Sequence, residues 1–339
     1  MAANFSDTEE IWTNDKLGWH HTAYFCIIDT TNVVGLVAYS LVWQTILRHR
    51  KTTFQNPFYA LALSLGVYDI LMLLLLLLYV TTIAYVGEDD VHQTIRLLGG
   101  LAYFWLTWNV NFHIVLISVN RLVAVVTLTK YSQHFTTTTT RALIVLSPLT
   151  ATINVWASFI LGCRLSVPYG LVFRSLCPST MTATWIVQYS RFMSVIFVAA
   201  VPTIYCLIFV FAKRGQNTSV SETRLAVQFA TIAFANFAFF ASYWITRQLQ
   251  KTNQMSPYYA DMIFGSFSTL NSALNPFIYL IFSSDIRSKL THPKLTSLKS
   301  KLSSICCLKV NKDRVQDQQY NTSEAPEACW ANSRSRTEA

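Results

Sequence analysis

Seven long apolar runs constrain the fold of this chain of 339 residues more than any other feature. Each run exceeds about 20 residues, the length that an α-helix needs to cross a bilayer at a rise of about 1.5 Å per residue. Helices are expected because a backbone in lipid must satisfy its own hydrogen bonds, and these continuous runs lack the alternation of a barrel strand. The expected spans are 25–47, 57–83, 97–126, 141–162, 185–212, 225–246 and 259–282.

The composition agrees with a membrane protein. Only 13% of the residues are charged, compared with about 25% in a typical soluble domain. The segment from Leu71 to Leu78 contains no polar residue, whereas a helix at the surface of a soluble protein keeps a polar face. The predicted fold class is therefore an all-α membrane protein, a seven-transmembrane helix bundle.

The basic residues indicate the orientation. Most Lys and Arg residues lie in the loops after the first, third and fifth spans and in the C-terminal tail. The positive-inside rule then places the N-terminus outside and the C-terminus inside. The net charge of +9 faces cytoplasm and anionic membrane lipids in this arrangement, rather than nucleic acid. The predicted organisation is an extracellular tail at 1–24, a receptor domain at 25–282, a basic segment or short eighth helix at 283–307 and a disordered cytoplasmic tail at 308–339.

Two spans carry polar side chains at the depth of the lipid, where such groups are costly and mark either function or helix contacts. Asp69 lies in the middle of the second span. The seventh span carries Asn271, Ser272 and Asn275, and Pro276 removes a backbone hydrogen bond there. Asn271 and Asn275 are four residues apart and share a helix face. We expect them to meet Asp69 in one polar cluster, either as a functional network or as hydrogen bonds that hold helices together.

The third span carries two further groups of interest. Arg121 lies at its inner end, directly after Asn120. Glu222, before the sixth span, is the acidic residue expected within reach of Arg121. The alternative is an arginine that extends to the membrane interface. His113 stands alone in the same span.

These positions resemble the motifs of the rhodopsin-like receptor family. The match consists of a Leu-x-x-x-Asp pattern that ends at Asp69, an arginine that closes the third span, Pro202 in the fifth span, and Asn-Ser-x-x-Asn-Pro-x-x-Tyr from Asn271 to Tyr279. The residues after the seventh span, 284–287, resemble the start of that family's short eighth helix. The resemblance implies an activation network of Asp69, Asn120, Arg121, Glu222, Asn271, Ser272, Asn275, Pro276 and Tyr279.

A narrower resemblance is carried by 56–59 (Asn-Pro-Phe-Tyr), 65–69 (Leu-Gly-Val-Tyr-Asp) and 118–122 (Ser-Val-Asn-Arg-Leu). These stretches are similar to nematode serpentine chemoreceptors, near classes V, G, T and X. That likeness implies a chemosensory G-protein-coupled receptor in the plasma membrane or a sensory cilium, with a heterotrimeric G protein as partner and a small molecule or peptide as ligand.

The chain departs from the rhodopsin-like pattern at four places. Asn120 stands where that family has an acidic residue, and Arg96 stands where it has the third-span cysteine. Phe237 to Phe240 replace the Trp-x-Pro of the sixth span, and Val210 replaces a fifth-span tyrosine. The family's usual disulfide to the second outer loop therefore cannot form, and its usual activation switch is not assumed.

Cysteines near the outer face suggest a different bridge. Cys163 and Cys177 flank the second outer loop, in an oxidising compartment, and a bridge between them would restrain that loop. Free thiols, or a pairing with Cys26, are the alternatives. No ligand-spaced cysteine pair is present in the sequence, so neither a metal nor a cofactor is predicted.

A ligand site in a helical bundle is expected at the outer face, lined by aromatic and a few polar groups. Packing in the bundle or at the membrane interface is the alternative for each aromatic residue. Arg191 is expected either to meet an anionic ligand or to pair with Asp29 or Asp261. The candidates are Tyr103, Thr107, Trp108, Tyr189, Arg191, Tyr243, Trp244 and Thr269, with Trp105 and Phe264 beside them.

Two modification sites are expected outside the bundle. Asn4 begins a glycosylation sequon on the outer tail. Cys306 and Cys307 follow a basic segment at the inner leaflet, where they are either palmitoylated or free.

Rival functions find less support. A transporter or channel is the alternative, but the odd number of spans, the lack of an inverted repeat and the lack of charged rings argue against it. An intramembrane enzyme would need paired aspartates, a Ser/His pair or a metal motif within the spans, and the sequence carries none that we recognise.

Overall fold

The structure is a computed structural model that describes residues 18–49, 56–87, 90–127, 130–166, 174–176, 180–214, 220–252 and 254–291. The chain divides into two compact units, Met1–Arg287 and Ser288–Ala339. Helices α1 to α9 belong to the first unit, and the boundary between the units falls within α10.

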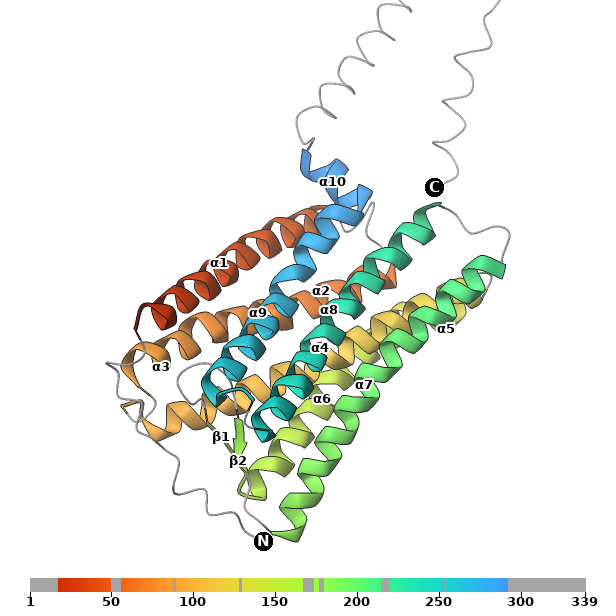
Figure 1. Cartoon of the computed structure of the whole chain (residues 1–339). Helices are drawn as coiled ribbons and strands as arrows, with labels where there is room; N and C mark the ends of the chain where they lie inside the picture. Colours follow the sequence, from red (N-terminus) through yellow and green to blue (C-terminus); the bar gives the residue numbers. More distant parts are fainter. Residues whose placement is uncertain are drawn as a thin grey trace, which may run out of the picture. The chain divides into compact units, whose positions relative to one another are not determined.

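Seven long helical segments run side by side in the described part of the first unit (Figure 1). They are α1 (Gly18–Arg48), α2 (Pro57–Leu75) continued by the π-helical turn η2 (Leu76–Val80) and by α3 (Thr81–Val86), α4 (Gln93–Val126), α6 (Thr137–Ile160), α7 (Met181–Arg214), α8 (Val220–Lys251) and α9 (Pro257–Phe282). Two short helices, α5 (Tyr131–His134) and α10 (Ser284–Thr291), follow α4 and α9 in the chain.

Four of these segments are long and apolar enough to cross a membrane, namely His21–Arg48, Pro57–Val86, Gln93–Val126 and Thr137–Ile160. In α7 an apolar stretch covers Val195–Phe211. Polar residues such as Asn271 and Asn275 lower the hydropathy of α9, which is otherwise long enough to span. The predicted all-α seven-helix membrane bundle is confirmed.

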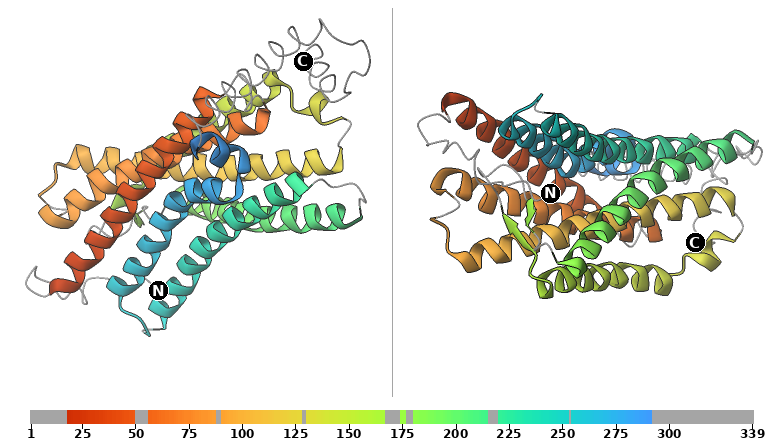
Figure 2. Two further views of the ribbon diagram at one scale, coloured as in Figure 1. Left: turned by 90° about the horizontal axis from the view of Figure 1, so that it is seen from above. Right: turned by 60° about the horizontal axis from the view of Figure 1, so that its bottom comes forward.

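The first and sixth long helices extend beyond the predicted spans. The first helix begins at Gly18 instead of 25, and α8 covers Val220–Lys251 instead of 225–246. A small hairpin was not predicted. It pairs β1 (Arg164–Ser166) with β2 (Arg174–Leu176), β1 contacts α4, and the hairpin lies where α6 ends and α7 begins (Figure 2).

Local sequence signals explain several helix ends. Asn56 caps α2, its Oδ1 atom accepting a hydrogen bond from the Phe58 amide at 3.0 Å, and Pro57 occupies the first helical position. Ser256 and Pro257 repeat this arrangement at the start of α9. Both follow the preference for a polar N-cap followed by proline. Gly162 has φ 75° and ends α6, because a left-handed residue closes the last turn of a helix.

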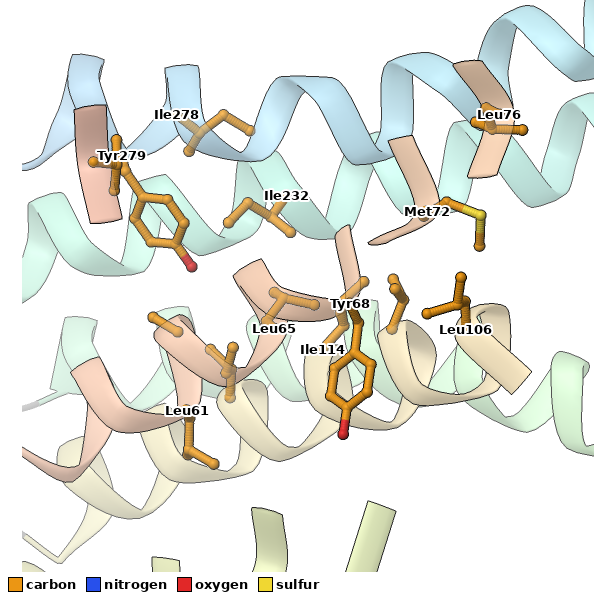
Figure 3. Packing of buried hydrophobic residues seen from close by; sticks show 14 of the residues in the cluster. Leu61, Leu65, Tyr68, Met72, Leu76, Leu106, Ile114, Ile232, Ile278 and Tyr279 are labelled. Carbon is orange, nitrogen blue, oxygen red and sulfur yellow. The ribbon is translucent and has the colours of Figure 1, made fainter. Parts of the chain in front are cut away.

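The core lies around α4, which contacts α2, α6, α7 and α8. On α2 the buried positions recur every three or four residues, as expected for a helix with one face on its neighbours. Figure 3 shows side chains from four long segments meeting in this cluster: Leu61, Leu65, Tyr68, Met72 and Leu76 from α2 and η2, Leu106 and Ile114 from α4, Ile232 from α8, and Ile278 and Tyr279 from α9.

A glycine sets the close approach of α1 to α9. A Cβ atom at Gly35 would lie 3.1 Å from the Ala273 Cβ atom and 3.1 Å from the Leu73 Cδ1 atom. Small residues let membrane helices pack closely. The buried Tyr39 lies about one helical turn after Gly35 in α1.

We therefore expect Gly35→Leu to separate α1 from α9 and to lower stability by about 1–3 kcal/mol, the usual cost of overpacking. The measurement is the melting temperature of the detergent-purified protein. Val37→Leu, on an exposed position of the same helix, is the matched control. Equal melting temperatures for the two variants would contradict close packing at Gly35.

The second span contains a break in its hydrogen-bond ladder. The five residues Leu76–Val80 form one π-helical turn, and the Thr81 amide bonds to the Leu76 carbonyl. The Thr81 hydroxyl donates to the Asp29 Oδ1 atom of α1 at 2.7 Å. This contact ties the outer part of the second span to α1.

Candidate functional site

A buried polar cluster joins three helices near the middle of the bundle. The Asp69 carboxylate on α2 is fully buried, and its Oδ2 atom accepts hydrogen bonds from the Tyr39 hydroxyl of α1 and, at 2.8 Å, from the Asn275 Nδ2 atom of α9. Ser272 of α9 also interacts with this carboxylate. One carboxylate oxygen therefore sets the relative positions of α1, α2 and α9.

The two asparagines of the seventh span have different partners, although they were predicted to share one cluster. Asn275 meets Asp69 as expected, but the Nδ2 atom of Asn271 donates to the Asn236 Oδ1 atom of α8 at 3.4 Å. Residues four apart on a helix differ by about 40° in direction, which is enough for them to face different neighbours. Pro276 lies inside α9 directly after Asn275.

Tyr39 was missed by sequence reasoning. It lies in a span that also carries Asn32 and Ser40, so its hydroxyl was not singled out as a partner of Asp69. Its spacing from Gly35 was a usable signal, because a small residue and a hydroxyl-bearing aromatic four positions apart share one face.

At the inner end of α4 five residues form a group that we name the Arg121 cluster: Asn56, Phe58, Asn120, Arg121 and Tyr131. The Cζ atom of Arg121 lies 3.6 Å from the centroid of the Phe58 ring. The Asn120 Nδ2 atom donates to the Tyr131 hydroxyl at 3.0 Å, and that hydroxyl donates to the Asn56 Oδ1 atom at 3.1 Å.

Other tyrosines surround the same guanidinium group. Four tyrosines, Tyr131 among them, interact with it electrostatically: Tyr59 of α2, Tyr131 of α5, Tyr205 of α7 and Tyr279 of α9. The predicted partner Glu222 lies in α8, but its side chain is outside the described residues. The predicted network residues Arg121 and Tyr279 thus lie close to one another, together with a phenylalanine that was not predicted to take part.

A second buried network links α2, α4 and α6 through His113. Its Nδ1 atom lies 2.9 Å from the Asn109 carbonyl oxygen, so Nδ1 carries the proton. The Nε2 atom then accepts from the Ser64 hydroxyl at 2.9 Å. The Ser147 hydroxyl of α6 lies 3.2 Å from Nδ1 and donates to the Asn109 Oδ1 atom at 2.7 Å.

The expectation that His113 stands alone is therefore wrong in three dimensions. Asn109 of its own helix binds Nδ1, and the two serines come from α2 and α6, which no local pattern in its own span reveals. A serine in each of two distant spans is too common a feature to have predicted the contact.

The outer half of the bundle holds the predicted ligand residues in separate places. Tyr103 interacts with Thr107 of its own helix and with Ser268 of α9. The Tyr243 ring lies 5.2 Å from the Phe264 ring, which stacks on Phe239 at 4.9 Å. Thr269 is buried in α9. These residues lie on α4, α8 and α9.

Other predicted ligand residues point elsewhere. The Trp108 ring packs on Phe197 of α7, and its Nε1 atom donates to the Thr150 hydroxyl of α6 at 3.4 Å. The Trp105 Nε1 atom donates to Thr152 of α6. Tyr189 and Trp244 are about half exposed, at 47% and 50%. Arg191 lies in α7, but its side chain is outside the described residues.

Cys163 takes part in a disulfide. Cys26 is free, so it is not the partner. The predicted partner Cys177 lies outside the described residues, as do Asn4, Cys306 and Cys307. The described residues contain no group of three His, Cys, Asp or Glu side chains suited to a metal ion.

The bundle of seven long helices, with buried polar groups at mid-depth and a guanidinium group at the inner end of α4, defines a seven-helix membrane protein. The sequence profile described as "Serpentine type 7TM GPCR chemoreceptor Srv" matches residues 30–294. The chain belongs to this family of serpentine chemoreceptors. A comparison with curated proteins finds none that matches the chain.

The family match confirms the predicted likeness to nematode serpentine chemoreceptors and the multi-pass membrane topology. The Srv family is a family of G-protein-coupled chemoreceptors, not of enzymes.

Proposed function

We propose that the chain binds a chemical ligand at the outer face of the bundle and activates a heterotrimeric G protein through its inner face, in the plasma membrane or a sensory cilium. The observation that carries the proposal is the Asp69 cluster. It joins α1, α2 and α9 between an outer half with aromatic and hydroxyl side chains and an inner end with Arg121. Receptor family membership supports it.

The proposed mechanism is a shift between two states of the bundle. A ligand changes their populations only by binding one state more tightly, and the G protein must prefer the same state. In this proposal the ligand contacts Tyr103, Thr107, Tyr243 and Thr269, which lie on α4, α8 and α9. The ligand contacts of four other candidates remain predictions from the sequence: Trp108, Tyr189, Arg191 and Trp244.

Arg121 has the role of G-protein contact in this proposal. Its charge lies at the inner end of α4, and in the active state it would leave its present neighbours and meet the C-terminus of the Gα subunit. Basic residues of the inner loops suit an acidic partner and anionic lipid. Three modifications are proposed with the same topology: glycosylation of Asn4, acylation of Cys306 and Cys307, and a bridge between Cys163 and Cys177.

The test is a screen of volatile and water-soluble small molecules on cells that express the receptor with a panel of Gα subunits, with intracellular calcium as the readout. Arg121→Ala and Asn275→Ala are expected to reduce the response at least tenfold at equal surface expression. Val126→Ala, an exposed position at the inner end of α4, is the control and should respond like the native receptor. A ligand-evoked ion current that persists without G proteins would refute the proposal.

A further inference from the structure

The Arg121 cluster closes on itself. Asn56 Oδ1 accepts from the Phe58 amide and from the Tyr131 hydroxyl, and Tyr131 in turn accepts from Asn120. Asn120 precedes Arg121 in α4, and the Arg121 guanidinium group lies over the Phe58 ring. Asn56, which caps α2, is therefore linked to both partners of the contact. It binds the Phe58 amide directly, and it reaches Asn120, the neighbour of Arg121, through Tyr131.

The Phe58 ring is buried at the start of α2. Phe58 is 1% exposed and is the second residue of α2, directly after Pro57, whose fixed φ angle sets the direction of the first turn. A cation over an aromatic face is attracted by the negative charge of that face, and the attraction is stronger away from water. At 3.6 Å from the centroid the Cζ atom is well inside the range of about 6 Å for such contacts.

The other members of the Arg121 cluster carry no charge. Asn56, Phe58, Asn120 and Tyr131 are all uncharged, so none of them offers the guanidinium group a carboxylate. The rhodopsin-like pattern has an acid at the position of Asn120, and here that position binds Tyr131 instead. An aromatic face is thus the described contact on one side of Arg121.

We infer that Phe58 is a positioning residue that holds Arg121 in the silent state of the receptor through a cation–π contact, with Asn56, Tyr131 and Asn120 holding the contact in place. The inference rests on the proposed function, because it assumes that Arg121 must leave Phe58 to meet the G protein. The strength of the ring contact then sets the level of signalling without ligand.

The test replaces Phe58 with mono-, di- and trifluorinated phenylalanine, which keep the ring shape while successive fluorines withdraw charge from its face. The readout is ligand-independent dissociation of co-expressed Gα and Gβγ subunits at equal surface expression. We expect a graded rise of roughly five- to tenfold across the series, as expected for loss of a desolvated cation–π contact. Phe58→Leu, which removes the aromatic face, should also raise ligand-independent dissociation.

The same series at Phe197 is the matched control, since that buried ring packs on Trp108. Fluorination there should change nothing. A flat series at Phe58 would overturn the inference, as would a series whose slope equals that at Phe197. If Glu222→Gln raises basal signalling while the Phe58 series stays flat, an ion pair holds Arg121 and the inference is wrong.

A physical readout separates the inference from the proposed function. Spin labels on Val126 of α4 and Val227 of α8, both exposed, report the separation of the inner helix ends in the purified protein. A distance that increases along the Phe58 series without any response from the G-protein panel would support the role of Phe58 and contradict the G-protein proposal. No change in either readout would overturn the role of Phe58.

Discussion

Asp69→Ala is expected to abolish ligand-dependent signalling and to destabilise the protein by about 2–4 kcal/mol. The substitution leaves two buried donors, the Tyr39 hydroxyl and the Asn275 amide, without their common acceptor. An unsatisfied buried donor costs about 1–3 kcal/mol, and removal of a buried carboxylate offsets part of that cost. The melting temperature of the purified receptor and the calcium response in cells measure the two effects.

Two further variants assign the cost to individual bonds. Asp69→Asn keeps an acceptor oxygen and should lose less stability than alanine. Tyr39→Phe removes one donor and should cost about 1 kcal/mol, the net value of a typical hydrogen bond. Leu71→Ala, at an exposed position two residues away, is the control. If Asp69→Ala behaves like Leu71→Ala in both measurements, the cluster does not couple the three helices.

His113→Ala should be at least as harmful to stability, with a loss of about 3–5 kcal/mol. It removes a ring of aromatic size, for which truncation costs about that much, and leaves the Ser64 hydroxyl without its acceptor. Three helices depend on this ring, so we expect surface expression as well as the melting temperature to fall.

His113→Phe separates packing from hydrogen bonding. It keeps an aromatic ring, somewhat larger than imidazole, and removes both nitrogen atoms, and the unsatisfied partners are expected to cost about 1–3 kcal/mol. Trp156→Ala removes an exposed ring of α6 and is the control for the loss of aromatic area. A double-mutant cycle of His113→Phe with Ser147→Ala should show coupling, and additive effects would contradict the network.

Much of the fold was predictable because lipid permits few solutions. A run of about 20 apolar residues in a bilayer is a helix, and the seven runs therefore fixed the bundle. The helix ends were less predictable, since α1 begins at Gly18 and continues through a polar segment. The π-helical turn at Leu76–Val80 begins within the run of leucines from Leu73 to Leu78, which holds no signal for an extra residue.

Less of the site was predictable. Motif spacing placed Asp69 and Asn275 at the same depth, and they are hydrogen-bonded. Helical periodicity gives the face of one helix but not the neighbour opposite that face. For that reason Asn271 was assigned to Asp69 and in fact meets Asn236, and the role of Tyr39 went unseen.

The π-helical turn of the second span affects how such receptors can diversify. One inserted or deleted residue turns everything beyond it by about 100° around the helix axis, because an α-helix has about 3.6 residues per turn. Asp69 precedes the turn and Thr81 follows it. A change of length within 76–80 would therefore present a new set of side chains to the exterior while the internal linkage to α9 stays in register. Under the proposed function, ligand preference and signal transmission can therefore change separately along a single helix.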